Sequence, residues 1–150
     1  MNKTYLLDTN IISYLTDSNS LHREKIKNKL FSLEEQDKVA VSIITLYELS
    51  YGLATLQHTE HKKLFENAIS FIKDYLDVYP LNIEEIDIFG QIKAKYKKQT
   101  GINTKALKKN DLDFLIASTA ISQNIVLVSN DKIFEDIAEF GFELCFENWV

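Results

Sequence analysis

Two kinds of segment alternate along this chain of 150 residues. Five short apolar runs, each bounded by polar residues, have the length of a buried strand. They are Tyr5 to Leu7, Val39 to Val41, Val78 to Leu81, Ile125 to Val128 and Leu144 to Phe146. Between these runs, apolar residues recur every three or four positions, which predicts amphipathic helices. The expected helices span residues 21–33, 43–56, 64–76, 83–98 and 112–122.

This order of elements predicts the fold class. Strands that alternate with helices of ten or more residues need crossover connections, which favour parallel strands covered on both faces. We therefore expect an α/β protein, a three-layer α/β/α, Rossmann-like domain with a mainly parallel sheet of about five strands. Only one proline and four glycines occur, and no linker-like stretch interrupts the pattern, so residues 1–150 are expected to form a single domain.

Composition narrows the class of protein. A chain of this size buries roughly 68 to 70% of its unfolded surface, so its core needs no metal to hold it and a metal would serve chemistry. The single cysteine, Cys145, excludes a disulfide within the chain; we interpret it as a core residue of the last strand. The apolar run before Asp8 is too short for a secretion signal or a membrane span, which favours a cytoplasmic protein.

Four acids lie where a sheet of this kind binds ligands, near the carboxyl ends of its strands. Asp8 follows the first run, Asp131 the fourth, Glu48 lies in the helix after the second, and Asp113 begins the last expected helix. Each has a plainer alternative: Asp8 and Asp131 as helix N-caps, Asp113 as an acid favoured by the helix dipole, Glu48 as a solvated position. Glu48 is the least ordinary, because no Lys or Arg lies one helical turn away.

Taken together, the four acids indicate a metal site. Carboxylates that converge repel one another unless cations lie among them. Oxygen ligands of this kind suit Mg²⁺ or Mn²⁺, and Mg²⁺ commonly completes its shell with water and substrate phosphate, so we expect a substrate that carries phosphate. Neighbouring polar side chains are candidates to hold waters or ligand carboxylates in place. These supporting residues are Thr9, Asn10, Ser129 and Asn130.

A lysine run changes the meaning of the net charge of −5. The segment from Lys93 to Lys109 carries seven lysines and no acid, which leaves 10 bases against 22 acids elsewhere. A charge run of this kind is usually a solvated surface. This one leads directly into Asp113, so we interpret its last members, Lys105, Lys108 and Lys109, as contacts to a phosphate backbone.

The ordered motifs resemble those of PIN-domain ribonucleases, and most closely VapC toxins, over essentially the whole chain. The matching segments are Leu7-Asp8-Thr9-Asn10, Ser42-Ile43-Ile44-Thr45-Leu46-Tyr47-Glu48-Leu49 with Gly52-Leu53, Asp113-Phe114-Leu115-Ile116-Ala117 and Val128-Ser129-Asn130-Asp131. Two departures occur. First, Asn often precedes the family's third acid, and here it precedes Asp111, whereas Asp113 has the proper offset to Ile116-Ala117; Asp111 therefore stays an alternative. Second, Ser129 stands where the family more often has Thr.

The resemblance implies a Mg²⁺- or Mn²⁺-dependent endoribonuclease, the toxin of a type II toxin–antitoxin system, with RNA as substrate, a cognate antitoxin as partner and a homodimeric state. By motif, Asp8, Glu48, Asp113 and Asp131 are implied as the catalytic, metal-holding acids, and Thr9 as their hydroxyl support. Two alternatives stay open on the same fold: a catalytically silent module that binds RNA or protein, and a DNA nuclease.

Overall fold

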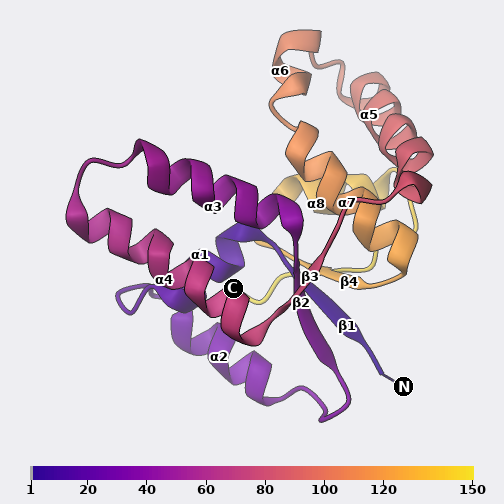
Figure 1. The fold of residues 1–150 in the computed structure, drawn as a ribbon. Helices are drawn as coiled ribbons and strands as arrows, with labels where there is room; N and C mark the ends of the chain where they lie inside the picture. The colour runs from indigo at the N-terminus through magenta and orange to yellow at the C-terminus, as the bar shows by residue number, and fades with distance from the viewer. Residues whose placement is uncertain (1) are drawn as a thin grey trace.

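The computed structural model describes residues 2–150 and contains one sheet of five parallel strands in the order β3-β2-β1-β4-β5 (Figure 1). The first strand of the chain therefore lies at the centre of the sheet. The strands are β1 (Thr4–Leu7), β2 (Lys38–Ser42), β3 (Asp77–Tyr79), β4 (Val126–Val128) and β5 (Phe146–Glu147). All five predicted strands are present, which confirms the expected parallel sheet.

Helices connect each strand to the next. They are α1 (Thr9–Thr16), α2 (Arg23–Phe31), α3 (Ile43–Thr55), α4 (Thr59–Tyr75), the 3₁₀ turn η1 (Ile83–Glu85), α5 (Ile86–Thr100), α6 (Thr104–Lys108), α7 (Asp111–Gln123) and α8 (Lys132–Glu139). The sequence pattern did not indicate α6, because a helix of five residues is too short to show a period. Its local signal is Asn103, whose side chain accepts a hydrogen bond from the Ala106 amide at 2.9 Å.

The sheet separates two cores, because successive residues of a strand point to opposite faces. In β1, Leu6 belongs to the core beneath α5, α7 and α8, whereas Leu7 belongs to the core beneath α1, α2 and α4. Leu127 and Val128 of β4 divide in the same way. Figure 1 shows the two groups of helices on either side of the strands, so the three-layer α/β/α architecture is confirmed.

The end of the chain differs from its prediction. The last apolar run was expected to form a strand over residues 144–146, but β5 comprises Phe146 and Glu147. Cys145 therefore lies before the strand and is exposed, so its interpretation as a core residue is wrong. Its carbonyl still accepts a hydrogen bond from the Leu127 amide at 2.8 Å. Within residues 2–150, no helix is both long and apolar enough to cross a membrane.

Two helical glycines are expected to respond oppositely to replacement by alanine. A Cβ at Gly52 of α3 would collide with the ring of Phe65, whereas a Cβ at Gly90 of α5 would meet nothing within 4 Å. Gly90→Ala should raise the free energy of unfolding by about 0.5–1 kcal/mol, because it restricts the unfolded chain. Gly52→Ala should lower it by about 1–3 kcal/mol through overpacking. Urea denaturation measures both; a stabilised Gly52→Ala variant would contradict the close α3–α4 packing.

Candidate functional site

Asp8 forms the buried centre of the site. It follows β1 directly, is only 5% exposed, and its amide donates to the Val128 carbonyl of the neighbouring strand at 2.9 Å. One carboxylate oxygen, Oδ1, accepts from the Thr9 amide at 2.8 Å, which caps α1. The other, Oδ2, accepts from the Ser129 hydroxyl at 2.7 Å. Both oxygens of this carboxylate are thus fixed in direction.

Glu48 reaches the same edge of the sheet from α3. This helix starts immediately after β2, where the Ser42 hydroxyl accepts from the Ile44 amide at 3.1 Å. The Thr9 hydroxyl lies 2.7 Å from Glu48 Oε1 and 3.1 Å from Thr45 Oγ1. Because a threonine hydroxyl has one proton, Thr9 donates to the carboxylate and accepts from Thr45. Sequence reasoning missed Thr45, whose buried position one turn before Glu48 is the only signal it offers.

Asp113 and Asp131 enter from the starts of two further helices. Asp131 caps α8, its Oδ1 accepting from the Ile133 amide at 3.1 Å, so the capping interpretation is correct and it leaves the other oxygen available. Asp113 lies half-buried in the first turn of α7, where no other side chain or amide hydrogen-bonds to its carboxylate among the described residues. Asp131 follows a short turn after β4, and Asp113, at the start of α7, lies close enough to Asp8, Asp131 and Glu48 to be affected by their charges.

The acids influence one another strongly. Burial raises the pKa of Asp8 to about 6, against the opposing hydrogen bonds from Ser129 and Thr9, and the charges of Glu48 and Asp131 raise it further. Burial also raises the pKa of Asp113 to about 7, together with the charges of Asp8, Asp131 and Glu48. The structure therefore brings all four predicted acids into one electrostatically coupled group.

The supporting residues form a chain of hydrogen bonds along this edge of the sheet. Asn10 Nδ2 donates to Ser129 Oγ at 3.4 Å, and Asn10 Oδ1 accepts from the Asn130 amide at 3.4 Å. Asn130 Oδ1 in turn accepts from Asn148 Nδ2 at 3.0 Å. Ser129 also accepts from the Asp131 amide at 3.0 Å, which joins the two capping acids. Asn148, near the end of the chain, was not foreseen from the sequence.

The lysine run divides into paired and unpaired members. Lys93 forms an ion pair with Asp111 at 2.7 Å, and Lys97 donates to Thr104 at 3.1 Å. Asp111, the alternative third acid, is thus engaged by a lysine, whereas Asp113 is surrounded by other carboxylates. The three candidate RNA contacts, Lys105, Lys108 and Lys109, are exposed and enter no ion pair within residues 2–150.

The donor set fits a hard divalent cation. In the described part of the chain, no three His, Cys, Asp or Glu side chains lie close enough to ligate one ion directly. Mg²⁺ does not require such a cage, since it usually keeps several waters and takes one or two carboxylates together with substrate phosphates. Burial and the charges of neighbouring acids raise the pKa of Asp8 and of Asp113, and a divalent cation would neutralise these carboxylates. The residues present therefore suit Mg²⁺ or Mn²⁺ held partly through water.

Comparison with known proteins gives a consistent result. A family model described as the PIN domain matches residues 5–140. Ribonuclease VapC2 of Rickettsia felis is 33% identical over 147 residues, covering 97% of each protein. A crystal structure of VapBC2 from Rickettsia felis bound to a promoter DNA fragment has a TM-score of 0.75 at 27% identity, covering 98% of this chain and 99% of that one. The structure of VapBC-1 from nontypeable Haemophilus influenzae has a TM-score of 0.71 at 28% identity, and the match covers 97% of this chain and 98% of that one.

Removing the charge of Asp113 is expected to stabilise the protein in a chelator. An acid whose pKa is raised on folding keeps its proton longer in the native state, so the free energy of unfolding falls as the pH rises from about 4 to about 7. The Asp113→Asn variant should lack the part of this pH dependence that Asp113 causes. Its free energy of unfolding should equal that of the wild type near pH 4 and exceed it by about 1–3 kcal/mol near pH 8. Denaturant titration of the wild type and the variant across this pH range measures the difference. Burial also raises the pKa of Glu85, but Glu85 is present in both proteins and contributes equally to their pH dependence.

Asp111→Asn is the matched control, because it makes the same chemical change two residues away. It removes the ion pair with Lys93 and should lower the free energy of unfolding at neutral pH by about 0.5–1 kcal/mol. A loss of stability in Asp113→Asn as large as in Asp111→Asn would instead assign Asp113 to helix capping.

Proposed function

This chain belongs to the PIN-domain family, in its VapC branch, and from that premise we propose that it is the ribonuclease toxin of a type II toxin–antitoxin pair. The observation that carries the proposal is the group of four coupled acids at the carboxyl edge of a parallel sheet, with Asp8 buried at its centre. Such a group matches the metal-dependent hydrolysis of a phosphodiester bond. The substrate is RNA, which a ribonuclease relative 33% identical over nearly the whole chain supports.

We assign the catalytic, metal-holding role to Asp8, Glu48, Asp113 and Asp131. These four acids would hold Mg²⁺ or Mn²⁺, which would supply Lewis acidity: a more acidic water and compensation of the charge on the leaving oxygen. The chain itself orients the carboxylates: Thr9 holds Glu48, and Ser129 holds Asp8. Asn10 and Asn130 fix Ser129 and the turn after β4, so that the acids keep their direction without metal.

Asp113 is favoured over Asp111 as the third acid. The carboxylate of Asp111 pairs with Lys93 at 2.7 Å, so its charge is already compensated within the protein. Asp113 forms no ion pair within residues 2–150, and burial together with the charges of the other three acids raises its pKa. A carboxylate that lacks an internal cation is the better one to receive an external one.

The proposed RNA path passes over the unpaired lysines Lys105, Lys108 and Lys109. All three are exposed, and α7, with Asp113 in its first turn, begins two residues after Lys109. Their charges balance the repulsion that the acidic group exerts on a phosphate backbone.

The proposal includes partners and context. Residues 1–150 act as one domain in the cytoplasm, a cognate antitoxin binds the protein, and two copies form a homodimer. The neighbouring solved structures are VapBC proteins, which supports an antitoxin partner. Exposed apolar side chains support a protein interface: Tyr47 and Tyr51 on α3 are 67% and 74% exposed, and Ile83 in η1 and Ile86 at the start of α5 are 77% and 62% exposed.

The central test is cleavage of RNA. The purified protein should cut structured RNA with Mg²⁺ or Mn²⁺ and stop when a chelator is added. Asp8→Asn and Asp113→Asn should each lower the rate by roughly 100-fold or more while the protein stays folded. Gel assays of labelled RNA measure the rate, and Glu143→Gln, an exposed acid in the turn before β5, is the control that should keep full activity.

Two results would redirect the proposal. Undiminished cleavage by both variants would remove the four acids from catalysis. No uptake of metal in a calorimetric titration, together with intact RNA, would favour the silent binding module, and faster cleavage of DNA than of RNA under one metal condition would favour the DNA nuclease.

A further inference from the structure

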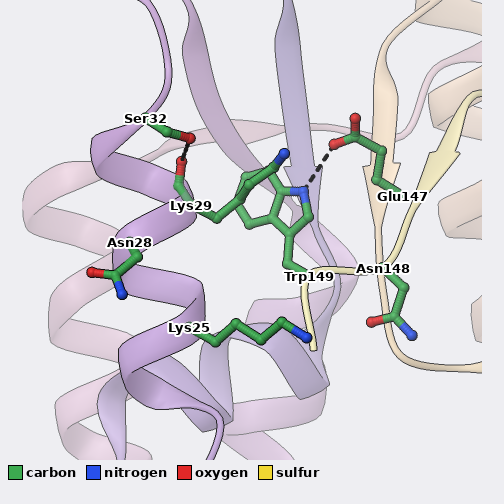
Figure 2. Close-up of a pocket in the computed structure, with 7 residues that line it drawn as sticks. All are labelled: Lys25, Asn28, Lys29, Ser32, Glu147, Asn148 and Trp149. Atoms are coloured by element: carbon green, nitrogen blue, oxygen red, sulfur yellow. Dashed lines mark hydrogen bonds between the residues drawn. The ribbon is translucent and has the colours of Figure 1, made fainter.

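A basic pocket lies between α2 and the end of the chain (Figure 2). Its volume is about 530 Å³. Four lining residues come from one face of α2 and three from the last strand and the residues after it. They are Lys25, Asn28, Lys29 and Ser32 on α2 and its C-cap, and Glu147, Asn148 and Trp149 at the other wall.

Two lysines in this pocket lack an internal partner. On the same helix, Arg23 and Lys27 pair with Glu24 at 3.4 Å and 3.7 Å. Lys25 and Lys29 form no ion pair within residues 2–150. They lie one helical turn apart, so their like charges repel each other. The side-chain amide of Asn28 between them makes no hydrogen bond to the described residues. The wall formed by α2 therefore offers two ammonium groups and an amide to a bound anion.

The opposite wall is rigid, and its one carboxylate is occupied. Trp149 is 3% exposed and packs against Tyr5 of β1 with ring centroids 5.4 Å apart. Its indole nitrogen donates to Glu147 Oε2 at 2.8 Å, as Figure 2 shows, and neither lysine pairs with that carboxylate. The indole fixes the direction of the Glu147 carboxylate, which keeps its charge, so the two lysines leave the lining with one net positive charge.

The pocket is connected to the acidic site. Asn148 lines the pocket, and its side-chain amide donates to the Asn130 side chain at 3.0 Å. The Asn130 amide donates to Asn10, which donates to Ser129, and the Ser129 hydroxyl donates to Asp8. Because β5 is parallel to β4, its carboxyl end lies at the same edge of the sheet as the acids. An extended polymer with its reacting bond at the acids can therefore follow this edge into the pocket.

We propose that the pocket formed by Lys25, Asn28 and Lys29 against Asn148 binds a backbone phosphate of the RNA, one or more nucleotides away from the bond that is cut. The inference rests on the proposed function and names a second contact for the same substrate. An RNA backbone is favoured over an acidic protein segment because the pocket is continuous with the acidic site through the hydrogen bonds of Asn148 and Asn130.

The experiment compares a double variant with a charge-matched control. Lys25→Gln/Lys29→Gln removes both cations, and Lys62→Gln/Lys63→Gln removes two exposed lysines on α4, outside the pocket. For one or two lost phosphate contacts, KM for RNA should rise roughly 5- to 25-fold at about 0.1 M salt with kcat within twofold. The slope of log Kd against log salt, measured by anisotropy with labelled single-stranded RNA in a chelator, should decrease by about 0.7–1.4.

Further variants make the result decisive. Lys25→Arg/Lys29→Arg keeps the charges and should keep KM near the wild-type value, and thermal melting checks that all variants are folded. Unchanged KM and salt slope in the glutamine variant, while the wild type cuts RNA, would overturn this inference and leave the proposed function standing. Loss of binding to a labelled polyglutamate peptide with unchanged RNA affinity would assign the pocket to an acidic protein. Failure of the wild type to cut or bind RNA would overturn both.

Discussion

The arrangement of this protein depends on keeping a buried carboxylate, Asp8, charged enough to be useful at the centre of a parallel sheet. Burial works against its charge, and two hydrogen bonds, from Thr9 and Ser129, work in its favour. The bond from Thr9 is the local N-cap of α1, whereas the bond from Ser129 exists because β4 lies beside the central strand β1, so that the turns after these strands meet. The start of α1 adds a favourable dipole at the same point. Ser129, which donates to this carboxylate, also accepts from the Asp131 amide, so the two acids are positioned together.

Sequence reasoning predicted the sheet and the acids because both have local signals. A buried strand is a short apolar run, and an acid directly after such a run is visible in the sequence. The contacts that orient those acids have no local signal, since Thr9 and Glu48 are 39 residues apart and Asp8 and Ser129 are 121 apart. The error at Cys145 has the same origin: at an edge strand of two residues, apolarity does not reveal which residues are paired.

Charge along the chain and charge in space also differ. The run from Lys93 to Lys109 appears uniformly basic in sequence, yet Lys93 neutralises Asp111 in the folded protein. Lys25 and Lys29 appear unremarkable in a helix that also contains Arg23, Glu24 and Lys27. Only the ion pairs of their neighbours and the approach of Asn148, more than a hundred residues away, set them apart. Exposed lysines that form no ion pair within residues 2–150 therefore come from two distant parts of the chain, the segment before α7 and one face of α2.

The central position of β1 has a further consequence for folding kinetics. Its two neighbours, β2 and β4, are separated from each other by most of the chain, and β4 pairs with it across about 120 residues. Parallel pairing over such distances closes a long loop before any contact repays the lost entropy, which makes it a late event. Until β4 docks, Asp8 has no Ser129, and α8 has not brought Asp131 to the edge. We therefore expect the complete group of four acids to form only when β4 has joined the sheet.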